Sequence, residues 1–339
     1  MQKHHVFLVH GITDLTNVPR DFKDLTARIR KHFRSLYKVD PDNYLEFVPV
    51  SWDNEVGEGE RAIYERCFGQ ITPTDRTFVT TTFNPIDDAD FMFEAIKQPR
   101  NQLEMFFSRF NRWRGWRYFS TLFMGHVIAY SNKNDNGIRR AMWSTLKKHL
   151  LENAPEVPSY SIVGHSMGAV ISFDFLFELM TNLKLFQFGE GTETPDHLDK
   201  LQAKEIRNAF RNFYSMGSPI SLFLMRRKEL WSNGSQKRFG KVKNPFEGTQ
   251  NKWMNFLSTD DVFGYPVQPL FGEEMDLGQK ANPQDIYVEN GLLPPWAHIN
   301  YWRNESVAKE IARSIGQSIF PTGVASDRER ELSGSRTSG

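Results

Sequence analysis

The sequence predicts an α/β protein built around a mostly parallel β-sheet, and three observations support this. A β-branched and aromatic run, an amphipathic helical pattern and a second apolar run follow one another near the start of the chain, which is the βαβ order of a parallel sheet. A later apolar run leads through a glycine-flanked serine directly into an apolar helical pattern. The chain has 339 residues, of which 39% are hydrophobic, so it can form one large domain with a sizeable core.

The first elements alternate in the order that this fold requires. Val6 to Val9 predicts a buried strand that ends at His10-Gly11, where glycine allows a tight turn. Residues 21–36 carry apolar side chains at spacings of three and four, which predicts an amphipathic helix. Residues 44–52 predict a second strand. Pro49 within it favours the edge of the sheet or a strand end, because proline has no N–H for the strand ladder.

Between residues 53 and 135 this alternation stops, and a helical, aromatic-rich insertion is expected. Residues 106–123 interleave eight aromatic side chains with four arginines. One interpretation is an interfacial helix or lid that makes peripheral contact with a membrane. A cap over an acyl pocket and a helix that packs its aromatic side chains on the core are the alternatives, and the sequence leaves all three open.

The remaining segments complete the predicted domain. Helices are expected at residues 138–151, 167–183 and 301–319, strands at 159–163, 212–216 and 254–257, and loops at 184–203, 225–248 and 265–295. The polar tail is expected to be disordered. The prediction is therefore one α/β domain over residues 1–320, with the insertion at 53–135 and a tail at 321–339.

Charge and composition exclude several classes of function. The net charge is +1, so no nucleic-acid partner is expected, because binding a polyanion through overall charge needs a basic excess. Cys67 is the single cysteine, so no disulfide can form within the chain. The first apolar run is too short for a signal peptide. With no apolar stretch long enough to span a membrane, a cytoplasmic location is expected. Neither metal nor cofactor is expected, because metal-ligand and phosphate-loop patterns are absent. The oligomeric state stays open.

The strongest motif is Gly164-His165-Ser166-Met167-Gly168, which lies between a predicted strand and a predicted helix. A serine in a sharp, strained strand-to-helix turn holds its hydroxyl clear of the sheet. Glycines two residues before and after it let strand and helix approach closely. The helix start directs N–H groups toward developing negative charge. The motif predicts a nucleophile, Ser166; the alternative is a serine that only caps the helix.

Residues 160–175, YSIVGHSMGAVISFDF, resemble the nucleophile elbow and following helix of the α/β-hydrolase superfamily of serine esterases and lipases. His10-Gly11-Ile12 resembles the superfamily's His-Gly element. The resemblance covers residues 5–52 and 125–320. It implies an α/β-hydrolase fold with helices on both faces of the sheet, and an oxyanion hole formed by the main-chain N–H groups of Ile12 and Met167.

A serine nucleophile needs a base, usually histidine, and a carboxylate that holds the histidine tautomer. The superfamily's chain order is serine, acid, histidine, which leaves His197 and His298 as candidates. His298 lies just before the last predicted helix, where the superfamily places its histidine, and is favoured. The alternative for His298 is a histidine packed among aromatic side chains.

The acid is expected to follow a late strand. The segment WMNFLSTDDVFGYPVQPL places Asp260 and Asp261 after a predicted strand and resembles a strand-Asp-loop of a lipase-like branch of the superfamily. Counting back from Pro269-Leu270 favours Asp261. Asp276 and Asp285 are weaker candidates because they lie inside the predicted loop.

The expected function is therefore a serine hydrolase that cleaves carboxylic esters, with small-molecule or lipid and acyl-chain esters as substrates, through a Ser166–His298–Asp261 triad and an acyl-enzyme intermediate. Thioesterase or peptidase specificity stays open, because these enzymes share the same machinery and differ in pocket shape. A non-catalytic binding or scaffold protein on the same fold is the alternative, since a fold does not fix a function.

Overall fold

The computed structural model describes residues 2–11, 18–52, 127, 130, 137–152, 156–181, 200–224, 244–271, 282–291 and 294–321. The chain divides into two compact units. One comprises residues 1–51, 142–185 and 193–339; the other comprises residues 52–141 and 186–192. In the second unit, the Arg139 guanidinium donates to the Tyr130 carbonyl oxygen at 3.1 Å and lies over the Tyr130 ring. Nearly all of the predicted insertion, and the tail from residue 322 on, lie outside the described residues.

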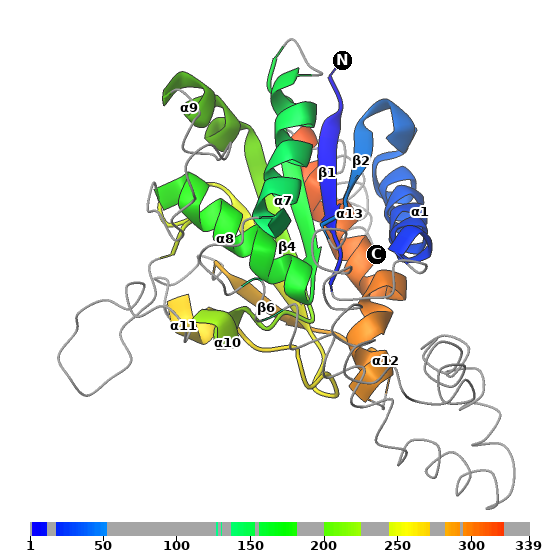
Figure 1. Ribbon diagram of the computed structural model, residues 1–339. Coiled ribbons are helices and arrows are strands. Elements are labelled where there is room, and N and C mark those ends of the chain that lie inside the picture. The colour runs from blue at the N-terminus through cyan, green and yellow to red at the C-terminus, as the bar shows by residue number, and fades with distance from the viewer. Residues whose placement is uncertain are drawn as a thin grey trace, which may run out of the picture. The chain divides into compact units, whose positions relative to one another are not determined.

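The first unit contains a parallel sheet (Figure 1). The described strands are β1 (His4–Val9), β2 (Leu45–Val50), β3 (Tyr160–His165), β4 (Phe210–Met216), β5 (Lys252–Leu257) and β6 (Gln284–Tyr287). Their order is β2-β1-β3-β4-β5-β6, and each neighbouring pair is parallel. The predicted α/β fold is confirmed. Pro49 lies in β2 at the sheet edge, as the sequence predicts.

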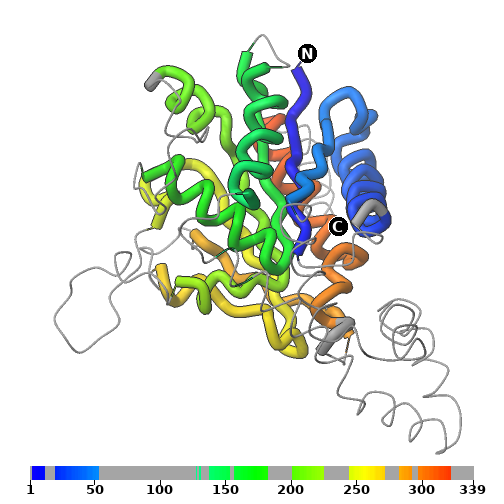
Figure 2. The backbone as a smooth tube through the Cα atoms, in the orientation of Figure 1, coloured from blue at the N-terminus to red at the C-terminus, as the bar shows by residue number. Residues whose placement is uncertain are grey.

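One face of the sheet packs against the first and last described helices, α1 (Val18–Tyr37) and α13 (Glu305–Ile319). These two helices lie side by side although they are far apart in the sequence, blue and orange-red in Figure 2. Val6 and Leu8 of β1, with Tyr214 of β4, point into the core beneath them. Alternate strand residues carry these contacts, because successive side chains of a strand point to opposite faces.

The other face packs against α8 (Met167–Thr181), most of whose residues are buried. The ring of Phe173 on α8 packs on Trp253 of β5, which in turn contacts Phe213 of β4. Helix α7 (Gly137–Lys147) continues into the π-helical turn η3 (Lys148–Glu152). Helices therefore cover both faces of the sheet, in agreement with the fold that the sequence predicts.

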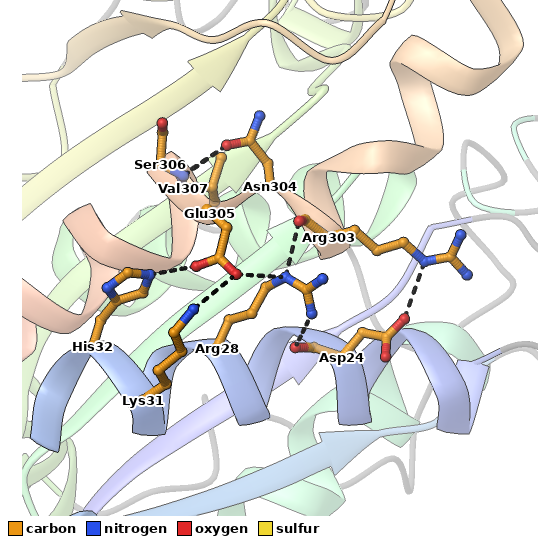
Figure 3. Close-up of polar contacts among 9 residues, drawn as sticks. All are labelled: Asp24, Arg28, Lys31, His32, Arg303, Asn304, Glu305, Ser306 and Val307. Atoms are coloured by element: carbon orange, nitrogen blue, oxygen red, sulfur yellow. Dashed lines mark hydrogen bonds and ion pairs between the residues drawn. The ribbon is translucent and has the colours of Figure 1, made fainter. Parts of the chain in front are cut away.

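Polar contacts tie α1 to the start of α13 (Figure 3). Glu305 accepts hydrogen bonds from His32 at 2.6 Å and from Lys31 at 3.4 Å. The Asn304 side chain caps α13 by accepting from the main-chain N–H groups of residues 306 and 307. A cap of this kind satisfies N–H groups that have no partner inside the helix. The start of α13 is thus fixed independently of its apolar face.

Two predicted loops contain regular structure, so those predictions are wrong. Helix α9 (Lys200–Ala209) begins within the last residues of the predicted loop at 184–203. Helix α11 (Gln268–Phe271) and strand β6 lie within the predicted loop at 265–295, and α12 (Pro294–Ile299) begins at the end of that loop. In α9 only Ile206 and Ala209 are buried hydrophobic residues, so the sequence shows little of the apolar periodicity that predicts a helix. Other short described elements are η1 (Pro41–Asn43), α10 (Ile220–Leu224) and η6 (Asn300–Arg303). The predicted helix at 301–319 starts later, at Glu305.

Candidate active site

The candidate site lies at the carboxyl ends of the strands, where the strand order reverses. From β1 the chain passes to β2 at one edge of the described sheet, and the next described strand, β3, pairs with the opposite side of β1. Adjacent parallel strands whose connections leave to opposite sides open a crevice at their carboxyl ends, which is where open α/β sheets bind ligands. His10 follows β1 and Ser166 follows β3 at this point.

Ser166 lies in a strained turn between β3 and α8. Its φ is +52°, a left-handed conformation that costs a non-glycine residue about 1–2 kcal/mol. The two flanking glycines are required by close packing. A Cβ on Gly164 would lie 2.6 Å from Cα of Ala169, and one on Gly168 would lie 2.3 Å from the carbonyl oxygens of Val9 and His10. The turn therefore needs these glycines for space, as the motif predicts.

Three side chains from separate segments meet at this turn. His298 Nε2 lies 2.9 Å from Ser166 Oγ, and His298 Nδ1 lies 2.9 Å from Asp261 Oδ1 and 3.1 Å from Oδ2. Because an ionised carboxylate only accepts hydrogen bonds, Nδ1 carries the proton and donates it. Nε2 of the neutral ring is then an acceptor for the Ser166 hydroxyl. The arrangement can move a proton from the serine to the imidazole.

The loop after β5 presents Asp261, and not Asp260, to the imidazole. The Asp261 side chain has 0% exposed surface, whereas Asp260 is exposed. Burial alone would raise the pKa of Asp261, but the hydrogen bond and charge of His298 outweigh it. The Phe263 N–H and the Tyr301 hydroxyl add to this, and the pKa falls below its usual value. Asp261 therefore stays ionised at neutral pH.

The other acid candidates do not face the imidazole in the described residues. Asp285 lies on β6, where its carboxylate accepts from the Asn255 amide at 2.8 Å and from the main-chain N–H groups of Val267 and Gln268. It thus holds β6 to the neighbouring loop. Asp276 lies outside the described residues.

The predicted oxyanion donors are only partly described. Met167 opens α8 and is buried, so its main-chain N–H belongs to the first turn, where N–H groups lack an acceptor within the helix. Ile12 lies outside the described residues, as do His197 and Cys67. The ring Nδ1–H of His10, just before Ile12, donates to the Gly11 carbonyl oxygen at 2.6 Å.

Two residues at the site were missed by the sequence reasoning. His165 Nε2 donates to the main-chain carbonyl oxygen of His298 at 2.7 Å. Burial, with the neighbouring His298, lowers the pKa of His165 to about 3, so its ring is neutral. The Tyr301 hydroxyl donates to Asp261 Oδ2 at 2.9 Å. The only local sequence signals for these two residues are that His165 directly precedes Ser166 and that Tyr301 follows His298 by three residues.

Within the described part of the chain, no group of three or more His, Cys, Asp or Glu side chains could hold a metal ion. None of the helices described there is long and apolar enough to cross a membrane.

Comparisons with known proteins give a distant similarity to a phospholipase. No protein-family model matches the chain. The chain is similar to phospholipase DDHD1 of Homo sapiens, with 23% identity over 341 residues. The match covers 95% of this chain but 36% of phospholipase DDHD1, so the chain spans well under half of that protein's length.

Proposed function

We propose that this chain is a serine hydrolase that cleaves carboxylic esters of lipids or other acyl chains through an acyl-enzyme intermediate. The observation that carries the proposal is the hydrogen-bonded series from Ser166 Oγ through His298 to Asp261, with 2.9 Å at each of its two steps. The similarity to phospholipase DDHD1 supports a lipase-like hydrolase at a coarser level.

In the proposed reaction, Ser166 Oγ attacks the ester carbonyl carbon while His298 Nε2 takes the hydroxyl proton. Asp261 stabilises the imidazolium that forms and keeps Nε2 directed at the serine. His298 then gives the proton to the leaving alcohol, and the acyl group stays on Ser166. A water molecule, deprotonated by His298, attacks the acyl-enzyme and releases the acid.

In this proposal, the main-chain N–H groups of Ile12 and Met167 stabilise the negative charge that develops on the carbonyl oxygen. Such donors act at their full strength because they are fixed before the reaction begins. Losing one of them costs about 3–4 kcal/mol of transition-state stabilisation in comparable enzymes. Because the donors are main-chain groups, side-chain substitutions at these positions test them poorly.

Phospholipids are the first substrates to try, because the human relative is named a phospholipase. The contrast that matters is between a long-chain diacyl phospholipid in vesicles and a short soluble ester such as p-nitrophenyl butyrate. Turnover of both with preference for the phospholipid supports a lipase-like specificity. Turnover of the short ester alone assigns the site to a small-ester hydrolase.

The test of the chemistry is labelling by a fluorophosphonate, which reacts with an activated serine. We expect labelling of the wild-type chain and none of Ser166→Ala. Asp261→Asn should lose about 10³–10⁴-fold in kcat, while its neighbour control Asp260→Asn keeps its turnover. Undiminished ester turnover by Ser166→Ala would refute the assignment. A folded wild-type chain that neither labels nor turns over any ester would favour the non-catalytic scaffold.

A further inference from the structure

The carboxylate of Asp261 is held by more than the imidazole. Its Oδ1 accepts from His298 Nδ1 and from the main-chain N–H of Phe263, both at 2.9 Å. Its Oδ2 accepts from the Tyr301 hydroxyl at 2.9 Å. A buried carboxylate is costly unless its lone pairs are satisfied. Tyr301 is therefore a side-chain donor to Asp261 in addition to His298.

The direction of the Tyr301 hydrogen bond is fixed by a second contact. The main-chain N–H of Ser258 donates to the Tyr301 hydroxyl oxygen at 2.8 Å. Since a hydroxyl has a single proton, that proton points to Asp261. Burial and the nearby Asp261 charge raise the pKa of Tyr301, so the proton stays on the tyrosine throughout the working pH range.

Tyr301 and His298 reach the same carboxylate from one helical segment. They are three residues apart across the junction of α12 and η6, and residues at this spacing lie on one face of a helix. On the other side, Ser258 and Asp261 belong to one tight loop, in which the Asp261 N–H donates to the Ser258 carbonyl oxygen at 3.1 Å. Tyr301 thus joins the acid's loop to the histidine's helix.

The main chain just after β4 packs against Tyr301 and Asp261. Gly217 has a φ of +52°, and a Cβ there would lie 2.7 Å from Cε2 of Tyr301 and 2.8 Å from Oδ2 of Asp261. The main chain therefore packs directly on the tyrosine–aspartate pair. Neither side chain has room to turn away from the other on this side.

We propose that Tyr301 is a positioning residue for the triad acid: it aims the Asp261 carboxylate at His298 Nδ1 and, by competing for Oδ2, weakens the carboxylate as an acceptor for the imidazolium. This rests on the proposed serine hydrolase function. Its consequence is that loss of the Tyr301 hydroxyl should displace the acidic limb of the pH–activity profile.

The titratable groups that face Asp261 are few in the described residues. His298 comes from α12, Tyr301 from η6 and His165 from the end of β3. Burial lowers the pKa of His165 to about 3, so it does not titrate between pH 5 and 9. A change in the acidic limb of the activity profile therefore reports on the pair of His298 and Asp261.

The experiment compares Tyr301→Phe with the matched control Tyr160→Phe. Tyr160 is also fully buried, at the start of β3, and its hydroxyl has no hydrogen-bond partner among the described residues. For Tyr301→Phe we expect kcat on p-nitrophenyl butyrate and the rate of fluorophosphonate labelling to fall about tenfold, with KM unchanged. The acidic limb of kcat/KM should move to higher pH by about half a unit. Tyr160→Phe should match the wild type in all of these.

A second replacement covers the case in which Tyr301→Phe does not fold. Tyr301→3-fluorotyrosine keeps the ring and the hydroxyl but makes the hydroxyl a stronger donor, so the acidic limb should move the opposite way, to lower pH. An acidic limb that stays in place in whichever of the two variants folds would overturn the proposal, even if kcat falls, because the role would then be structural only. An inactive, unlabelled wild-type chain would instead overturn the serine hydrolase function itself.

Discussion

We expect mild acid to destabilise this fold through two buried histidines. His4 lies between the hydroxyls of Ser159 and Ser161, 2.9 Å from each, and His165 donates to a main-chain carbonyl. Burial lowers the pKa of both side chains to about 3. In the unfolded chain a histidine takes up a proton near pH 6.5. Below that pH the unfolded state binds protons that the folded state does not. The free energy of unfolding therefore decreases as the pH is lowered.

The magnitude follows from the size of the gap. One pH unit corresponds to about 1.4 kcal/mol per group, so at pH 5 each histidine lowers the free energy of unfolding by about 2 kcal/mol. Asp21 acts in the opposite direction. Burial raises its pKa to about 6, so the folded state takes up a proton first and gains about 1 kcal/mol at pH 5. The net loss from these three groups is about 3 kcal/mol, out of a typical free energy of unfolding of about 5–15 kcal/mol.

The assay is urea unfolding followed by tryptophan fluorescence at pH 7.5 and pH 5.0. The free energy of unfolding should be about 3 kcal/mol lower at pH 5.0. In His4→Gln, which removes one titrating group, the difference between the two pH values should shrink by about 2 kcal/mol. Equal stability at both pH values, or an unchanged difference in His4→Gln, would refute the reasoning.

Three further substitutions test the turn and the last helix by the same unfolding assay. Gly168→Ala places a methyl group 2.3 Å from two carbonyl oxygens and should lower the free energy of unfolding by about 3 kcal/mol. The control Gly248→Ala has a φ of +72° but open space around the new methyl group, so it should lower the free energy of unfolding by only about 1 kcal/mol. Equal losses in the two variants would contradict the packing argument. Ser166→Gly should be about 1 kcal/mol more stable than Ser166→Ala, because only glycine relieves the strain at a φ of +52°; a less stable glycine variant would mean that the turn is unstrained. Asn304→Ala should lose about 1 kcal/mol and Asn304→Ser less, since serine keeps a capping oxygen; equal losses would count against the cap.

The parallel sheet could be predicted because most of its strands are apolar runs followed by local stop signals. Strand β6 (Gln284–Tyr287) was missed because its first three residues are only half-buried and Tyr287 is exposed, so the strand carries little apolar signal. Helix α9 was missed for a similar reason, because its burial depends on two small contact points, Ile206 and Ala209. Elements that tertiary packing holds against weak local propensity leave little trace in a single sequence.

The residues of the candidate site likewise fall into those that the sequence predicts and those that it does not. Ser166 and His298 could be proposed from a local motif and from chain order, and the structure brings them together. The spacing from Pro269-Leu270 favours Asp261 over Asp260, and the structure directs the Asp261 carboxylate at His298 Nδ1. His165 and Tyr301 could not be found, because their partners lie 133 and 40 residues away in the chain.

The pairing of α1 with α13 has a consequence for how the protein is synthesised. The first helix begins at Val18, but the helix that packs beside it ends only at Ile319. During translation, the apolar stripe of α1 therefore has no partner helix until residues 305–319 have been synthesised and have left the ribosome. A nascent chain halted before residue 305 should bind chaperones and be cut readily by proteases, and one halted well beyond α13 should not.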